Sequence, residues 1–174
     1  GTTEVAIISL SAVAYSESLR VAGDELDDAI VRYLQRKHQL AIGVIAAEKI
    51  KIEGASACPI DSLSDVINVV GKDLLTSIPK SIKMSKEEVR EAIEEPISAI
   101  LESVRRALEK LPAEFVSDLN ETGMVLTGGG ALLKGLDQRI ENETGINVIV
   151  AEDPLESVTM GCGKALEEMN KYKK

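Results

Sequence analysis

Hydrophobic and polar positions follow two different periods along the chain, and each change of period predicts where strands give way to helices. Val5 to Leu10 and Val13 to Arg20 are rich in β-branched residues and indicate two strands separated by Ser11 and Ala12, which predicts a hairpin. In the following stretch, VAGDELDDAIVRYLQRKHQL, apolar residues recur at helical spacing and acidic residues crowd the first turn, where the helix dipole favours them. The chain should therefore open with a β-hairpin and a helix.

The middle of the chain has a weaker pattern. The stretch AAEKIKIEGA predicts a helix that ends at Gly54, although its isoleucines also alternate as they would in a strand. Between residues 61 and 85, the segments SDVINVVGKD and KSIKMS are typical of strands and are joined around Pro79. We interpret residues 41–85 as a smaller insertion into a layer that the two flanking parts, 1–40 and 86–174, form together.

A long helix is predicted next. Ser85 and Glu88 form the S-x-x-E pattern of a capping box. Pro96 lies inside the predicted helix and should kink it or split it. Behind the cap, an apolar stripe at spacings of three and four consists of Val89, Ile93, Ile97, Ile100, Val104 and Leu108.

The last third alternates between the two kinds of element. We predict strands at Met124–Thr127 and Ile146–Ala151, and helices at Ala131–Asn142 and Ser157–Asn170. Strands that alternate with helices predict helices packed on a sheet. The fold class is therefore α/β.

Composition and charge argue against several classes of function. The 29 acidic residues outnumber the 20 basic ones, giving a net charge of −9, which argues against a nucleic-acid partner. No apolar run approaches the length of about 20 residues that spans a bilayer, and the first residues lack the pattern of a signal peptide. We expect a cytoplasmic protein. His38 and the two cysteines, Cys58 and Cys162, have no metal-site spacing, so we expect a structural or surface histidine and small buried thiols.

Three consecutive glycines, Gly128, Gly129 and Gly130, follow a predicted strand and precede a predicted helix. Ligands bind beyond the carboxyl ends of strands in α/β sheets, and bare backbone N–H groups at a helix start suit an anion or a polar ring. A tight turn that needs positive φ is the alternative. One glycine would serve a turn, and three exceed that need.

Two further stretches could contact the same ligand. Gly1, Thr2 and the next threonine form GTT directly before a strand and could cradle phosphate oxygens, although a simple turn explains them too. Glu48 and Lys51 are three residues apart on one helix face, where they could contact ribose hydroxyls or a purine ring. An exposed ion pair between them is the alternative.

Taken in order, GTTEVAIISL, RVAGDELDDAIVRYL, AAEKIKIE, MVLTGGGALLKGLDQRI and VIVAEDPLESVTMGCGKALEEM resemble the second half of the MreB family of bacterial actin homologues. The resemblance runs from Gly1 to Met169. It implies an actin-like, RNase H-like subdomain IIA carrying a smaller inserted subdomain IIB. It also implies ATP as ligand, with Gly1 and Thr2 near the phosphates and Glu48 and Lys51 at the ribose and adenine edge. The adenosine loop would be Gly128, Gly129, Gly130 and Ala131.

The resemblance also implies what lies elsewhere. The first phosphate loop, the carboxylate that orients the attacking water and any membrane-inserting element would belong to the other half of the family's proteins. We therefore expect this chain alone to hydrolyse no ATP. The parent protein would be a slow ATPase that binds ATP with Mg²⁺ and assembles into filaments beneath the inner membrane. It would determine cell shape by organising cell-wall synthesis, and it would bind a membrane adapter of the RodZ type.

Two alternatives remain open. A stand-alone, non-enzymatic module could bind such an adapter or cap filaments. A different ATPase of the superfamily, such as an Hsp70-type chaperone or a sugar kinase, would need further domains or residues.

Overall fold

The computed structural model describes residues 1–9, 12–59 and 66–171. Its elements in chain order are β1 (Thr3–Ser9), β2 (Ala12–Leu19), α1 (Gly23–His38), β3 (Leu40–Ala41), α2 (Val44–Gly54), β4 (Val66–Asp73), β5 (Pro79–Ser85), α3 (Lys86–Glu109), the 3-10 turn η1 (Ala113–Phe115), α4 (Val116–Thr122), β6 (Met124–Leu126), the 3-10 turn η2 (Gly129–Leu132), α5 (Leu136–Thr144), β7 (Val148–Val150) and α6 (Ser157–Lys171).

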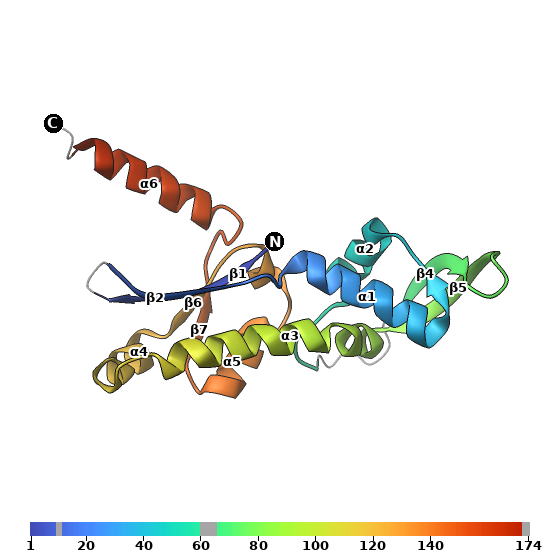
Figure 1. Ribbon diagram of the computed structural model, residues 1–174, viewed down its shortest axis with the longest axis horizontal. Helices are drawn as coiled ribbons and strands as arrows, with labels where there is room; N and C mark the ends of the chain where they lie inside the picture. The colour runs from blue at the N-terminus through green and yellow to red at the C-terminus, as the bar shows by residue number, and fades with distance from the viewer. Residues whose placement is uncertain (10–11, 60–65, 172–174) are drawn as a thin grey trace.

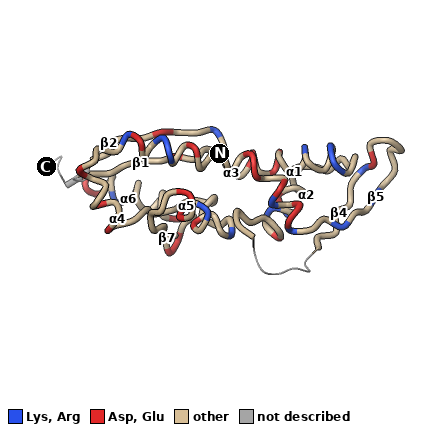
Figure 2. Tube along the Cα trace, turned by 90° about the horizontal axis from the view of Figure 1, so that it is seen from below, with Lys and Arg blue, Asp and Glu red and all other residues tan. Residues whose placement is uncertain are grey.

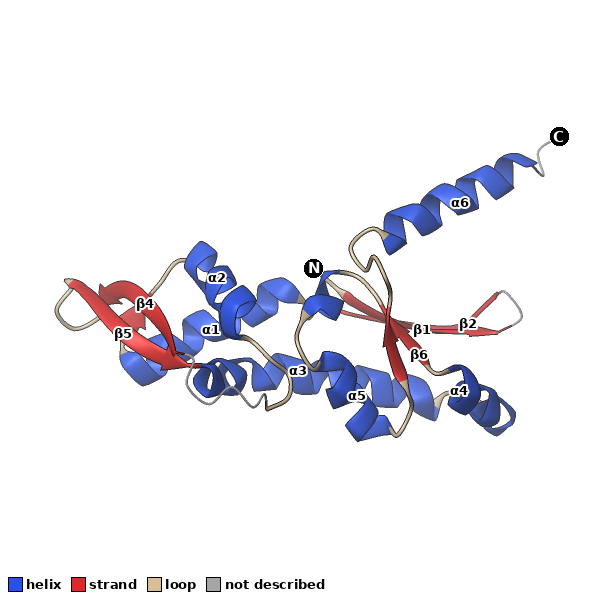
Figure 3. Ribbon diagram, turned by 180° about the vertical axis from the view of Figure 1, so that it is seen from behind, coloured by secondary structure: helices blue, strands red, loops and turns tan. Residues whose placement is uncertain are grey.

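The molecule is elongated (Figure 1). The long helices α1 and α3 run along it, with β4 and β5 at one end and β1, β2 and α4 toward the other, while α6 projects from the body (Figures 1 and 3). Basic and acidic residues are interspersed along the helices (Figure 2). In the described part of the chain, no helix is both long and apolar enough to cross a membrane.

The opening hairpin is confirmed. β1 and β2 pair antiparallel from Thr3↔Leu19 to Ser9↔Ala12, with a register shift between Ile7 and Ile8. The predicted strand end at Leu10 and the turn residue Ser11 lie outside the described residues, as do the first two residues of the segment SDVINVVGKD.

The middle part contains one strand that the sequence pattern did not predict. The two-residue β3 pairs with the end of β4, and β4 pairs with β5 along its whole length, giving the antiparallel order β3-β4-β5. The stretch from Val44 to Gly54 is a helix, so the strand alternative for its isoleucines is wrong. Ile50 is buried against the core while Ile52 is exposed, because the two lie on different sides of α2.

The capping box is confirmed and the expected break in the long helix is not. Ser85 Oγ accepts the backbone N–H of Glu88 at 3.2 Å, and a Glu88 carboxylate oxygen accepts the backbone N–H of Ser85 at 3.0 Å. α3 is continuous from Lys86 to Glu109 although Pro96 lies inside it. Apolar residues on both sides of Pro96 are buried, including Ile93 and Ile97, and this packing outweighs the local preference of proline.

The C-terminal part differs from the prediction in the start of one helix, while α6 begins at Ser157 as predicted. The predicted helix at Ala131–Asn142 is instead the short turn η2 followed by α5, which begins only at Leu136. The short α4 was not predicted. β6 and β7 pair in parallel, and this pair forms a separate sheet from β1–β2 in the described chain. An apolar groove of about 570 Å³ lies between β1 and β6, lined also by α3 and α4.

The structure also places the single histidine and the two cysteines. His38 Nε2 lies 3.0 Å from a Glu88 oxygen, which confirms a structural role for this histidine. Cys58 is buried, as expected. Cys162, on the projecting α6, is exposed, so the expectation of a buried thiol is wrong there.

Candidate functional site

The first turn of α1 and one side of α2 meet through a lysine. Lys51 donates hydrogen bonds to Asp27 Oδ2 at 2.8 Å and to the backbone carbonyl of Gly23 at 3.2 Å. The Lys51 side chain is 18% exposed. A Cβ at Gly23 would lie 3.4 Å from the lysine nitrogen, an ordinary van der Waals contact, so the backbone carbonyl and not the missing side chain is what matters here. The ammonium group is thus held at the N-terminal end of a helix.

This geometry changes the interpretation of Glu48 and Lys51. The alternative of an exposed ion pair between them is wrong, because Lys51 pairs with Asp27 on another helix. Burial raises the pKa of Asp27, the Lys51 ammonium lowers it, and the carboxylates of Glu48 and Asp24 add to the rise. Glu48 is exposed and close enough to act on this charge cluster.

The N-terminal GTT lies against the same turn of α1. A Cβ on Gly1 would lie 3.3 Å from the Cβ of Ala22, the residue directly before α1. Thr2 is exposed. The structure therefore brings together two of the stretches singled out from the sequence, GTT and the Lys51 helix, although they are about 50 residues apart.

Only one residue of the glycine run, Gly128, has a backbone conformation that favours glycine. Gly128 has φ +83 and donates its N–H to the carbonyl of Pro154 at 2.8 Å. Gly129 and Gly130 have negative φ, and added Cβ atoms would meet only Leu155 at 3.6 Å or nothing within 4 Å. The turn interpretation explains Gly128 alone. The other two leave bare backbone beside open space, as a ligand that lies against the chain would require.

The segment that follows the glycine run is tied to the segment that follows α2. Ala57 donates its backbone N–H to the carbonyl of Lys134 at 2.8 Å, and a parallel bridge joins Ser56 to the same residue. Ala131, the last residue of the predicted adenosine loop, is buried and anchors η2 to the body. This backbone link is made by Lys134, and Lys51 takes no part in it.

Sequence reasoning missed Asp27 and Gly23. Gly23 begins α1, and Asp27 directly follows the acidic first turn, whose charge was attributed to the helix dipole. A hint was present, since a buried carboxylate needs a partner and Asp27 lies on the apolar side of the helix, next to Leu26 and three residues before Ile30. The partner Lys51 is 24 residues away, beyond the reach of helical spacing.

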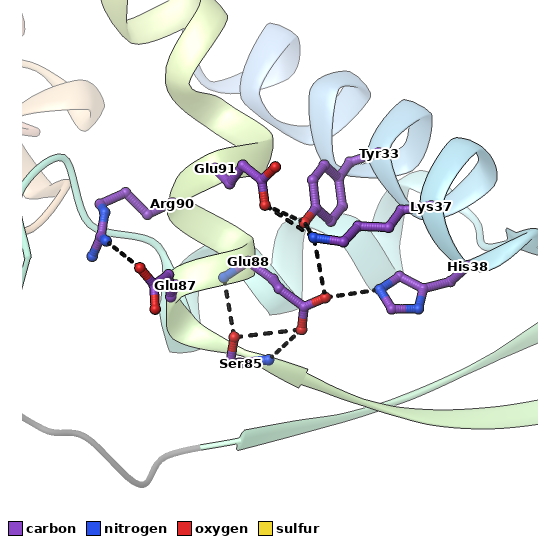
Figure 4. A network of polar contacts seen from close by, with 8 residues as sticks. All are labelled: Tyr33, Lys37, His38, Ser85, Glu87, Glu88, Arg90 and Glu91. Carbon is purple, nitrogen blue, oxygen red and sulfur yellow. Dashed lines mark hydrogen bonds and ion pairs between the residues drawn. The ribbon is translucent and has the colours of Figure 1, made fainter.

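A second polar cluster lies at the far end of α1 and α3 (Figure 4). Tyr33 donates to Glu91 at 2.6 Å, and Lys37 contacts both of these residues. The hydrogen bonds from Tyr33 and Lys37 lower the pKa of Glu91. A hollow of about 420 Å³ lies beside this cluster. Its charges pair with one another across two helices, so we interpret the cluster as a structural contact between α1 and α3.

A sequence model of the MreB/Mbl protein family matches residues 1–174. The chain belongs to the MreB/Mbl family. It is 48% identical over 172 residues to the cell shape-determining protein MreB of Escherichia coli, covering 99% of this chain and 49% of that protein. It is 38% identical to the cell shape-determining protein Mbl of Bacillus subtilis, covering all of this chain and 52% of that protein. The chain thus spans about half the length of these relatives.

Solved structures confirm the actin-like α/β fold. MreB5 of Spiroplasma citri bound to ADP has a TM-score of 0.93 and 31% identity, covering 99% of this chain and 52% of that one. The double helical filament of MamK has a TM-score of 0.70 at 21% identity, covering 89% of this chain and 48% of that one, a likeness of fold alone. The MreB and Mbl relatives are named as cell shape-determining proteins.

Proposed function

We propose that this chain is the adenosine-binding half of an ATP-dependent, filament-forming protein that determines bacterial cell shape. The observation that carries the proposal is the open backbone at Gly129 and Gly130, which neither φ nor packing explains. A nucleotide that lies against this backbone would explain it. The relative MreB5 was solved with ADP and with AMPPNP, which supports a nucleotide as the ligand.

The proposed nucleotide-binding residues are those of the three sequence stretches. Lys51 and Glu48 would hydrogen-bond the ribose and the adenine edge, and Gly1 and Thr2 would lie toward the phosphates. The adenosine loop would be Gly128, Gly129, Gly130 and Ala131. The hydrogen bond of Lys51 to the first residue of α1, close to Gly1, supports one shared ligand.

Magnesium and hydrolysis are proposed for the intact protein only. The described residues contain no group of three His, Cys, Asp or Glu side chains that could hold a metal ion. Mg²⁺ commonly binds proteins through one or two carboxylates together with substrate phosphates, so it would bind with the nucleotide. Phosphoryl transfer needs charge stabilisation from both sides of the phosphates. This half supplies one side.

The rest of the proposal concerns the parent protein. It would self-associate into filaments in the cytoplasm beneath the inner membrane, organise the cell-wall synthesis machinery and bind an adapter of the RodZ type. Membrane contact would come through the adapter or the other half, and nucleic acid would not be a partner. Residues 1–40 and 86–174 would form subdomain IIA, and residues 41–85 subdomain IIB.

A non-enzymatic interaction module is the second candidate function. The projecting helix α6 favours it, because Val158, Met160 and Leu166 on this helix are exposed. Contiguous exposed apolar patches mark surfaces that another protein covers, and α6 is the candidate for such a surface here. Such a module would bind a membrane adapter or cap filaments without needing nucleotide.

Titration calorimetry with ADP separates the two candidates. The nucleotide proposal predicts weak, saturable binding that Lys51→Ala reduces about tenfold, the loss expected for one charge-assisted hydrogen bond. Lys49→Ala, an exposed lysine on the same helix, is the control and should bind as the wild type does. Absence of saturable ADP binding, with an intact fold by circular dichroism, would favour the interaction module.

A further inference from the structure

A carboxylate near the N-terminal end of α1 is in an unfavourable setting. Asp27 is only 5% exposed. Its Oδ2 accepts the hydrogen bond from Lys51, whereas its Oδ1 is buried and has no hydrogen-bond partner among the described residues. A buried acceptor that lacks a partner is destabilising, and more so when it is charged.

Stability gives little reason to keep this pair. Moving a carboxylate and an ammonium group out of water carries a desolvation penalty, which their attraction offsets only when the remaining lone pairs also find donors. That condition fails at Oδ1. Buried apolar residues such as Ile30 of α1 and Ile50 of α2 already supply the packing between these helices. The ion pair therefore needs a purpose beyond holding the helices together.

The effect of the pair on Lys51 supplies one. A lysine side chain is long and loses considerable rotamer freedom when a ligand immobilises it. Here two N–H groups of the ammonium already donate, to Asp27 and to the carbonyl of Gly23. Since an ammonium has three donors, one remains for a ligand. The lysine is thus ordered before any ligand arrives.

We propose that Asp27 is the positioning residue for Lys51 in nucleotide recognition. Its buried carboxylate holds the ammonium at the first turn of α1, so that the remaining N–H is presented to the polar edge of the adenosine. Gly23 takes part through its backbone carbonyl, which accepts the second hydrogen bond of the ammonium. This inference rests on the proposed function, and its test includes one measurement that needs no nucleotide.

The first measurement is an affinity cycle with ADP on the 174-residue chain. Asp27→Ala and Lys51→Ala should each weaken ADP binding about tenfold, and the double variant should bind no more weakly than Lys51→Ala alone. Asp28→Ala is the matched control, because it removes the same charge from an exposed neighbour on the same helix. If Asp27→Ala lowers thermal stability but binds ADP as the wild type does, or if the two losses add, the proposal is wrong.

The second measurement is the nitrogen-15 NMR signal of the Lys51 ammonium, recorded without ligand. Slow hydrogen exchange should make this signal visible in the wild type and in Asp28→Ala, and Asp27→Ala should abolish it. An equally protected ammonium in Asp27→Ala would overturn the positioning role. If Asp27→Ala does not fold, Asp27→Asn keeps the size of the side chain and removes its charge, and it should also lose the signal.

The two measurements test different claims, so one can fail while the other holds. Absence of ADP binding in the wild type would remove the proposed nucleotide function. The ammonium signal would still decide whether Asp27 orders Lys51.

Discussion

Gly135 faces Cys58 so closely that a Cβ on the glycine would lie 3.1 Å from the Cβ of the cysteine. The two residues lie next to the hydrogen bond between Ala57 and Lys134, which ties the glycine loop to the segment after α2. Gly135 also has φ +73, in the left-handed region. One glycine therefore meets both a conformational and a packing requirement at this contact.

Gly135→Ala should lower the free energy of unfolding by more than the strain of positive φ alone, which is about 1–2 kcal/mol. Gly145→Ala is the matched control, since Gly145 has the same φ of +73 but nothing within 4 Å of its would-be Cβ. Urea denaturation of both variants isolates the packing against Cys58. Equal losses would show that the contact is unimportant.

Gly130→Ala tests the opposite case. Its φ is ordinary and its surroundings are open, so the variant should be as stable as the wild type to within about 0.5 kcal/mol. Its affinity for ADP should fall, because the added methyl group occupies the space where we place the ligand. Thermal melting and ADP titration of the same sample check both parts. Wild-type affinity would remove the main support for ligand binding at the loop.

The cap of α3 gives a stability prediction. Glu88 accepts the backbone N–H of Ser85 and contacts His38 on α1, so Glu88→Ala should destabilise the protein by about 1–2 kcal/mol. Glu87→Ala removes the same charge one residue earlier, where the side chain is 82% exposed and pairs with Arg90. That control should lose less than about 0.5 kcal/mol. Chemical denaturation that ranked the two variants equally would contradict the capping role.

The lowered pKa of Asp73 predicts part of the loss of folding stability at acid pH. The backbone N–H of Thr76, Lys80 and the backbone N–H of Leu75 lower its pKa from 3.8 to about 2. Because the folded-state pKa is depressed, the stability that the carboxylate supplies is present above 3.8 and is lost as the pH falls toward about 2. The stability difference between the wild type and Asp73→Asn should therefore shrink over that range. A difference that stays constant with pH in denaturation curves would refute this.

The elements that the sequence predicted correctly depend on local signals. The β1–β2 hairpin and the Ser85–Glu88 capping box depend on residues close in the chain, and both are confirmed. The continuity of α3 through Pro96 could not be predicted, because it depends on tertiary packing. The start of α5 was misplaced for a related reason. Leu136 becomes helical only after η2 and Gly135 have turned the chain.

The candidate site divides in the same way. The three glycines and Lys51 could be singled out from residue type and spacing. The partner of Lys51 could not, since Asp27 lies on a different helix and its burial is a property of the folded chain. The difference between Gly128 and the two glycines after it is likewise a matter of backbone angles.

The central claim is that an adenine nucleotide binds at the glycine loop and Lys51. The most direct measurement is an ADP titration of the nitrogen-15-labelled chain, followed by its backbone amide signals. The account predicts saturable shifts at Gly129, Gly130 and Lys51, with Val125 in the groove between β1 and β6 unaffected. Shifts confined to that groove, or no saturable shift at any of these amides, would contradict it.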